Sequence, residues 1–478
     1  MPGAARIDDQ VLARRVAQEF SPGEVVGLGP GLPGLIPGEL PAEQGVLFLA
    51  DSGALGYSLP GAAPGSGTAS PLPGSGPVDS SGRLVALLAG GALLSMVDVA
   101  AMARGGRVGA AVLQAAQVTA GGDFTHWTAG ATPGLFSPAA AVDLASGAGR
   151  VIAMMAHTGP DGIPNIVGRS SFPVDGVGCV GTIVTDAAVI QVTGDGLVLA
   201  EVAPGWTSDA VAAITGAPLA ASSSLREMNF DIPPLEPPNK VHTAQEAVRD
   251  VPDGAMVNID GFAGPGGMAH HLLVALRDQG AKNLTMISNT AGIARVVNFG
   301  TPPGRLAIDH SILVDNKQVK KAISSYPVSP RASQPSSFEL AFQRGEVELE
   351  VVPQGTLAER LRAGGAGVAA FYTPTGAGTL LAEGKETRVI DGKEYVLETG
   401  LTADFCLIRG HKADTLGNVV YKGTSRNFNP VMAAASRITV VEVDEIVEPG
   451  DLNPEQIVTP GIYVDRIVRR PDGFSPYE

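Results

Sequence analysis

The chain is poor in cysteine and has no long hydrophobic run. Its 478 residues include 2 cysteines, Cys179 and Cys406, which lie far apart and in no metal-ligand spacing. This usage argues against a disulfide framework and indicates a reducing compartment. No apolar run reaches the roughly 18 to 20 residues of a membrane-spanning helix, and the N-terminal segment carries acids and arginines where a signal peptide would be apolar. We therefore expect a soluble, cytoplasmic protein with no membrane partner.

Positive charge is scarce as well. Lys and Arg number 33 against 48 Asp and Glu, a formal net charge of -15, and no basic patch is visible. Because nucleic-acid-binding surfaces need such a patch, we expect no nucleic-acid partner. A small, soluble partner is expected instead. Hydrophobic residues make up 44% of the chain and charged residues 17%, which indicates well-formed cores rather than extensive disorder.

The chain repeats one plan on either side of a segment rich in Ser and Pro. We predict that this segment, residues 220–239, is an extended connector and a poor helix or strand. Each half begins with a helical pattern, a short turn, a strand and a Gly-rich turn. Late in each half a helix of small residues leads into a strand, near residues 139–158 and 429–447. This internal similarity predicts one domain at residues 1–219 and a related one at 240–478.

Both halves alternate helical patterns with short strands rich in Val, Ile and Leu. Examples of such strands are residues 106–113, 182–193 and 197–203. The alternation predicts an α/β fold with two related open domains, in which helices pack on largely parallel sheets. Ligands of such sheets bind at the carboxyl ends of strands. The turns at residues 29–34, 51–53 and 264–267 are expected at such ends.

Asp51 is a single carboxylate that ends an apolar run, and Ser52 and Gly53 follow it. One interpretation is an ordinary turn or helix-capping aspartate, which Asp-Ser-Gly sequences favour. The other is an acid that attacks a substrate. The turn of Gly29 and Gly31 lacks the Lys-Ser/Thr of a P-loop and the full spacing of a dinucleotide fingerprint, so it identifies neither type of site.

Two long segments carry a resemblance to a known family. Residues 353–386 and 400–464 closely resemble the A half of the family I coenzyme A transferases, such as the 3-oxoacid CoA-transferases. The first half resembles the B half through residues 28–37, 49–56 and 151–167, among others. The order here is B then A, whereas the fused animal enzymes run A then B. The resemblance implies the fold of that family, with a pseudo-heterodimer in one chain, and a homodimer of such chains.

The resemblance also implies a nucleophile. In the family, a glutamate in a Ser-Glu-Asn-Gly turn of the B half attacks an acyl-CoA and forms a mixed anhydride. The anhydride becomes an enzyme-CoA thioester, which passes CoA to an acceptor acid. Asp51 is aligned with that glutamate, beside Ser52 and Gly53. Losing one methylene withdraws the attacking oxygen by more than about 1 Å, which can cost roughly 10²-fold in rate unless the backbone compensates.

Further site residues are implied by the same alignment. The family's Gly-Gly-Phe-Gly turn, whose backbone helps to form the oxyanion site, corresponds to a segment in which Pro265 removes one N–H donor. A glycine-rich stretch of the family that lines the site is replaced by residues 135–144, with Pro138 and alanines. The implied oxyanion and active-site residues are Gly261, Phe262, Ala263, Gly264, Gln354, Ser52 and Gly53. The implied CoA-binding residues are Gly29, Gly31, Gly364, Gly365 and Gly367.

The resemblance predicts a transferase that moves CoA between an acyl-CoA and a carboxylic acid, such as a 3-oxo acid, in a ping-pong reaction with Asp51 as nucleophile. Coenzyme A enters as substrate, and no permanently bound cofactor or metal is expected. Two alternatives stay open. One is an acyl-CoA thioester or carbon-carbon hydrolase in which Asp51 is the general base for water. The other is an inactive acyl-CoA-binding homologue.

Three other features favour structural interpretations. His270 and His271 begin a helical segment, where a neutral imidazole could act as acid or base, but a surface or core histidine is favoured. The acidic residues at 442–448 are interpreted as polar positions of a strand and its exit, because no His or Cys joins them as metal ligands. The low-complexity segment at residues 61–77 predicts a mobile loop that could form a lid over the Asp51 turn.

Overall fold

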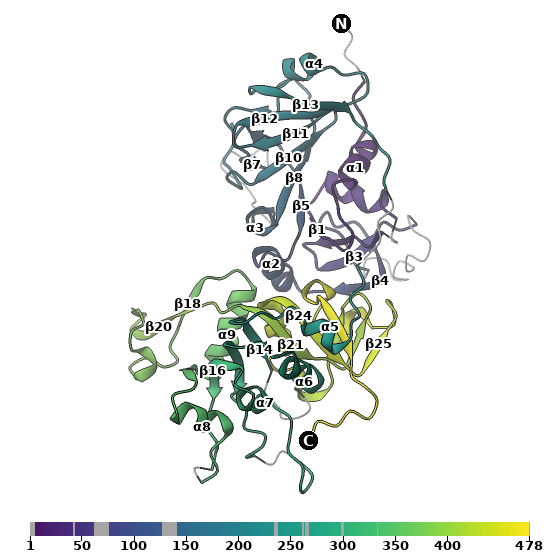
Figure 1. Ribbon diagram of the computed structural model, residues 1–478. Coiled ribbons are helices and arrows are strands. Elements are labelled where there is room, and N and C mark those ends of the chain that lie inside the picture. The colour runs from purple at the N-terminus through teal and green to yellow at the C-terminus, as the bar shows by residue number, and fades with distance from the viewer. Residues whose placement is uncertain are drawn as a thin grey trace. The chain divides into compact units, whose positions relative to one another are not determined.

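The computed structural model describes residues 5–41, 44–61, 76–126, 141–233, 238–260, 262, 267–297, 301–331 and 333–477. The chain divides into two compact units, Met1–Pro238 and Asn239–Glu478, drawn in purple to teal and in teal to yellow in Figure 1. Each unit has its own large sheet and its own hydrophobic core. No helix in the described part of the chain is both long and apolar enough to cross a membrane.

The first unit is built on a ten-stranded sheet. In spatial order its strands are β13 (Leu219–Glu227), β12 (Gly196–Val202), β11 (Ala188–Thr193), β10 (Val180–Thr185), β8 (Arg150–Met155), β5 (Ala110–Gln114), β1 (Val25–Leu28), β2 (Leu47–Ala50), β3 (Ala54–Ser58) and β4 (Ala86–Leu93). A small sheet joins β7 (Phe124–Thr125), β6 (Gln117–Thr119) and β9 (Ile166–Val167). The helices are α1 (Asp9–Ala17), the 3-10 helix η1 (Leu32–Gly38), α2 (Met96–Arg104), α3 (Ala141–Gly147) and α4 (Ser208–Ala213).

Two sequence predictions for this unit were wrong in part. Residues 182–193 and 197–203 form β10, β11 and β12. β10 pairs parallel with β8, but β11 pairs antiparallel with both β10 and β12. The connection from β10 to β11 is too short for the crossover that parallel pairing requires. The first part of the predicted connector is also a strand, β13, which pairs with β12 at the edge of the sheet. None of its residues is fully buried, which suits a strand at the edge of a sheet, and the Ser triplet lies within it.

The second unit has an all-parallel sheet of seven strands. In spatial order they are β17 (Glu348–Val351), β16 (Val319–Tyr326), β15 (Leu284–Thr290), β14 (Met256–Ile259), β21 (Ala403–Arg409), β24 (Ser436–Val443) and β26 (Arg466–Arg469). Two small sheets join β18 (Ala370–Thr373), β20 (Lys393–Thr399) and β19 (Thr387–Ile390), and β23 (Val419–Val420), β22 (Lys412–Asp414) and β25 (Glu445–Val447).

Helices pack on this second sheet, as parallel sheets require. The α-helices are α5 (Ala244–Val248), α6 (His270–Gln279), α7 (Ser311–Asp315), α8 (Ser337–Gln343), α9 (Gln354–Gly365) and α10 (Asn429–Ala434). The 3-10 helices are η4 (Leu380–Ala382), η5 (Gly423–Arg426), η6 (Pro454–Gln456) and η7 (Gly461–Tyr463). Apolar residues of α5, α6, α7 and α8 share one core with the strands, and α9 packs against α10 and β16.

The predicted internal repeat is confirmed. Each unit opens with a helix that leads into a central strand, α1 into β1 and α5 into β14. Late in each unit a short helix leads into another sheet strand, α3 into β8 and α10 into β24. The fold class is therefore α/β with two related open domains, as the alternation of helical and strand patterns predicts.

Candidate active site

Asp51 lies in a tight turn directly after β2. It is half-buried, and the turn is closed by a hydrogen bond from the N–H of Gly53 to the carbonyl oxygen of Ala50 at 3.1 Å. Gly53 has a φ of +104°, and a Cβ at this position would lie 2.0 Å from the carbonyl oxygen of Leu94. Because a side chain fits neither the dihedral nor the space, glycine is required here. The turn therefore holds Asp51 in a defined position at the carboxyl end of a strand.

A loop at residues 79–83 joins this turn to the predicted Gly29–Gly31 turn. The Ser80 hydroxyl accepts a hydrogen bond from the Asp51 N–H at 3.2 Å and donates one to the carbonyl oxygen of Leu28 at 2.7 Å. The neighbouring Ser81 hydroxyl accepts from the N–H of Gly31 at 2.8 Å. Strands β1 and β2 are parallel neighbours, with Leu28 paired to Ala50. The two turns that the sequence singles out thus lie side by side.

Sequence reasoning missed the residues that build this loop. The buried carboxylate of Asp79 accepts hydrogen bonds from the N–H groups of Ser81 and Arg83, at 2.8 and 2.9 Å, and from the Arg83 guanidinium at 2.8 Å. Ser52 adds a contact, since its hydroxyl donates to the carbonyl oxygen of Val78. A signal for such a loop was available in the sequence, because Asp-Ser-Ser-Gly is rich in residues that fold back on their own backbone.

A narrow pocket lies beside Asp51. It is lined by Leu49, Asp51, Met96, Val99, Ala100, Ala103, Asp143 and Leu144, from β2, α2 and α3. The space inside is about 10 Å³, at the lower limit for one water molecule. Most of the lining is apolar, so the Asp51 carboxylate has few protein groups that could compete with a substrate for it. Asp143 is a second carboxylate at this pocket, and it forms an ion pair with Arg104 at 2.9 Å.

The second unit brings two other predicted residues together. Phe262 and Gln354 line one pocket of about 300 Å³ with Gly355, Ala358, Asn427, Phe428 and Val431. The Gln354 amide donates to the side-chain oxygen of Asn289 at 3.0 Å. Phe262 meets Phe428 edge to face, with 6.3 Å between ring centroids. The residues missed by the sequence interpretation here, Asn289 and Phe428, come from other strands and loops and carry no local motif.

Several predicted site residues fall outside the described part of the chain. These are Gly261, Ala263, Gly264 and Pro265, and also residues 135–140 and most of the predicted lid at residues 61–77. Strand β14 leads into the segment for which an oxyanion role is predicted, and the buried Asp260 carboxylate directly after it accepts a hydrogen bond from the N–H of Phe262 at 2.8 Å.

Three predicted CoA-binding glycines lie at the opposite end of α9 from Gln354. Gly364 and Gly365 are its last residues, and Gly367 follows the helix with a φ of +68°. A Cβ on Gly364 would lie 2.2 Å from the carbonyl oxygen of Leu401. The helix is 12 residues long, about 18 Å from end to end. Close backbone packing accounts for Gly364, and a role of these glycines in CoA binding stays a prediction.

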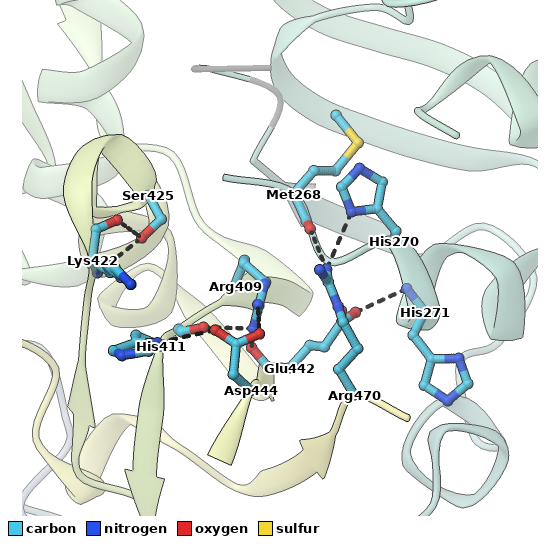
Figure 2. A network of polar contacts seen from close by, with 11 residues as sticks. Met268, His270, His271, Arg409, His411, Lys422, Ser425, Glu442, Asp444 and Arg470 are labelled. Atoms are coloured by element: carbon cyan, nitrogen blue, oxygen red, sulfur yellow. Dashed lines mark hydrogen bonds and ion pairs between the residues drawn. The ribbon is translucent and has the colours of Figure 1, made fainter. Parts of the chain in front are cut away.

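Glu442 of β24, Asp444 directly after this strand and the histidines of α6 belong to a structural network, shown in Figure 2. Glu442 is fully buried, and its carboxylate accepts hydrogen bonds from the N–H groups of His271 and Leu272 at 2.9 and 3.2 Å. It also pairs with Arg470. The carboxylate therefore caps the N-terminus of α6, where the helix dipole favours negative charge.

The same network keeps His270 neutral. The ring is fully buried, and its Nδ1 lies 3.2 Å from the Arg470 guanidinium. Burial first, and then the positive charges of Arg470 and Arg409, lower the pKa of His270 to about 3. The prediction of a core histidine is confirmed for His270. No group of His, Cys, Asp and Glu side chains among the described residues could hold a metal ion.

Comparisons with known proteins agree with the resemblance. The sequence model of the Coenzyme A transferase family matches residues 10–213 and 241–470. One chain of the probable succinyl-CoA:3-ketoacid coenzyme A transferase of Bacillus subtilis is 46% identical over 226 residues, which are 47% of this chain and 87% of the relative. The corresponding chain of the 3-oxoadipate CoA-transferase of Pseudomonas putida is 46% identical over 222 residues, 46% of this chain and 89% of the relative.

A solved structure is more distant. The acyl-CoA transferase YdiF of E. coli O157:H7, in a thioester complex with CoA, is 25% identical with a TM-score of 0.40. The similarity covers 49% of this chain and 48% of that chain, so about half of each is compared.

Proposed function

Because the chain belongs to the coenzyme A transferase family and is a transferase, we propose that it moves CoA from an acyl-CoA to a free carboxylic acid, with Asp51 as the nucleophile. The observation that carries this role is the position of Asp51. Its carboxylate stands at the carboxyl end of a parallel strand, in a turn fixed by Gly53 and Ser80, beside a mostly apolar pocket. A nucleophilic carboxylate depends on such positioning, because it is intrinsically weak.

The proposed reaction is a sequence of four acyl transfers. An oxygen of the Asp51 carboxylate attacks the thioester carbonyl. The carbon-sulfur bond breaks, the CoA thiolate is released, and a mixed anhydride forms between Asp51 and the acyl group. The thiolate then attacks the Asp51 carbonyl and releases the first acid, so that CoA is held as an aspartyl thioester. The acceptor carboxylate next attacks this thioester and releases the thiolate, which finally attacks the acyl carbonyl of the new anhydride. The new acyl-CoA leaves, and the Asp51 carboxylate is restored without any net proton transfer.

The acid partners are proposed from the relatives. Their names specify succinyl-CoA, 3-keto acids and 3-oxoadipate, so we propose a 3-oxo acid or a dicarboxylic acid as one of the two acids here. In the second unit, the pocket of Phe262 and Gln354 offers an aromatic face beside an exposed amide that can donate hydrogen bonds. Such a mixed lining suits an acyl chain that ends in a polar group.

The direct test is chemical trapping of the thioester. The protein is incubated with succinyl-CoA without an acceptor and reduced with borohydride, and its peptides are analysed by mass spectrometry. We expect the Asp51 carboxyl to be converted into an alcohol, and no such product in Asp51→Asn. Asp143→Asn is the matched control, because it removes the other carboxylate of the same pocket. It should leave the label on Asp51.

The same experiment separates the hydrolase alternative. If Asp51 activates water instead, CoA is released without an acceptor acid, no residue is reduced, and one solvent oxygen enters the acid product. That outcome would refute the nucleophilic role. Asp51→Glu adds a second test, since it restores the longer side chain: a gain in transfer rate shows that the remaining site suits a family glutamate.

A further inference from the structure

A second pocket of the Asn239–Glu478 unit is lined by arginines. It shares no residue with the pocket of Gln354, and its space is about 290 Å³. Three of its lining residues are Arg295, Arg305 and Arg331, and no Asp or Glu stands among the lining residues that the structure describes. Thr301 and Gln334 add polar groups. In a chain with a net charge of -15, this is a local excess of positive charge that the proposed reaction does not use.

The pocket lies where ligands bind in this class of fold. Its described lining comes from residues 294–296 and 301–307, after β15, and from Arg331 and Gln334, after β16. These strands are parallel neighbours, and their last residues pair, Thr290 with Tyr326. Both segments therefore leave the sheet at the same edge. That edge, outside the carboxyl ends of the strands, is the usual ligand site of open α/β sheets.

Two of the arginines are held in place by other parts of the unit. Arg295 donates to the Asp315 carboxylate at 2.8 Å, and Arg305 donates to the carbonyl oxygen of Tyr477 at 2.9 Å. These contacts fix the orientation of both guanidinium groups. The pocket is thus shaped before any ligand enters, which lowers the entropy cost of binding.

Arg331 is the least compensated of the three. Its side chain is exposed, and its guanidinium lies 3.4 Å from the Gln334 side-chain oxygen. Within the described ranges, no carboxylate forms an ion pair with it. Its backbone is fixed, since its N–H donates to the Ser329 hydroxyl at 3.2 Å and its carbonyl accepts from the N–H of Gln334 at 2.9 Å. A fixed backbone with an uncompensated guanidinium is suited to an incoming anion.

We propose that this pocket binds a phosphate group, with Arg305 and Arg331 as the principal contacts and Arg295 contributing charge. Guanidinium groups match phosphate oxygens in a bidentate fork, and several of them together favour an anion with more than one charge over a single carboxylate. The volume leaves room for a diphosphate. The phosphate has two conceivable sources, a free phosphate or nucleotide, or the nucleotide end of a CoA molecule, and the chemistry of recognition is the same for both.

The test is isothermal titration of the full chain with inorganic pyrophosphate, in the absence of any acyl-CoA. We expect saturable binding of one pyrophosphate per chain that weakens as salt is raised. Arg331→Gln should raise the Kd about tenfold or more, because a charge-assisted contact is lost. Arg331→Lys should give a smaller increase, because it keeps the charge and loses the fork. Arg344→Gln is the control: this exposed arginine of the same unit pairs with Glu346 at 2.9 Å, outside the pocket.

Two results would overturn the proposal. One is the absence of saturable pyrophosphate binding, and the other is equal binding by Arg331→Gln and Arg344→Gln. The source of the phosphate is read from competition. If CoA displaces pyrophosphate from the wild-type chain, and Arg331→Gln weakens the binding of both ligands, the site belongs to the nucleotide end of CoA. Pyrophosphate binding that CoA does not displace assigns it to a separate phosphate ligand. Because neither measurement involves Asp51 or transfer of CoA, failure of the proposed reaction would not affect the result.

Discussion

Replacing Gly53 by alanine tests whether the Asp51 turn is as tightly constrained as its geometry indicates. The new methyl group would lie 2.0 Å from the carbonyl oxygen of Leu94, which is backbone and cannot rotate away. The residue would also keep a φ of +104°, a conformation that side chains rarely adopt. Either the two strands β3 and β4 separate at this point, or the turn changes its dihedrals.

The expected cost is the sum of three terms. A positive φ costs an L-residue roughly 1–2 kcal/mol, and forcing a methyl group into packed space costs roughly 1–3 kcal/mol. The hydrogen bond from the N–H of Leu94 to the carbonyl oxygen of Gly53, 2.9 Å long, is lost or stretched, at about 1 kcal/mol. We therefore expect Gly53→Ala to lower the free energy of unfolding of the first unit by about 3–6 kcal/mol.

Gly82→Ala is the matched control. Gly82 also has a positive φ, +76°, and lies in the loop that supports Asp51, but nothing lies within 4 Å of its added Cβ. It should show only the dihedral cost of roughly 1–2 kcal/mol. Both tryptophans of the chain, Trp127 and Trp206, belong to the first unit, so urea unfolding followed by tryptophan fluorescence reports on that unit. Equal destabilisation by the two substitutions would refute the steric argument.

Three further predictions concern the pockets and the buried charges. Gln354→Ala should lower kcat/KM for acyl-CoA by roughly tenfold in steady-state assays, because one hydrogen-bonding side chain of the pocket is lost. The urea unfolding of the first unit, followed by tryptophan fluorescence, should not change. Burial lowers the pKa of His157 from 6.5 to about 4, so the unfolded chain binds a proton in this range that the folded chain does not. Stability should therefore fall by about 3 kcal/mol as the pH drops from above 6.5 to 4, and His157→Gln should flatten this pH dependence in urea curves recorded across the range. Glu442→Gln removes one partner of a buried ion pair and should destabilise the second unit by about 3–5 kcal/mol. The loss should be visible as faster amide hydrogen exchange in α6. Exchange in α6 as slow as in the wild-type chain would contradict the capping role.

Much of the fold was predictable from the sequence because its signals are local. The helices α1, α5 and α6 and the strands that follow them are visible as periodic patterns with turn residues between them. The direction of pairing is a different kind of information. The strands β10 to β12 have the same composition as the parallel strands, and only the short connections between them show that they pair antiparallel.

The site was predictable only where one segment carries its own signal. Asp51 and Gly53 could be identified because an apolar strand ends in a turn whose sequence restricts the backbone. The turn is held by Ser80, which comes later in the chain, and Gln354 is held by Asn289, which lies 65 positions before it. Contacts at such separation depend on how strands are ordered in a sheet, and no short pattern encodes that order.

The strand order of the second unit has a consequence for how the chain folds during synthesis. β14 pairs on one side with β15, close behind it, and on the other side with β21, whose pairing joins Asn258 to Cys406. The sheet can therefore grow toward β17 early, while its other half waits for the C-terminal third of this unit. Contacts of such long sequence separation form slowly. Until residues 403–469 leave the ribosome, one edge of β14 is unpaired, and an exposed strand edge is open to association with other chains. The first unit has no comparable delay in its antiparallel parts, where β2, β3 and β4 pair in succession and so do β10, β11 and β12. The half that carries Asp51 is thus expected to be folded well before the half that carries Gln354.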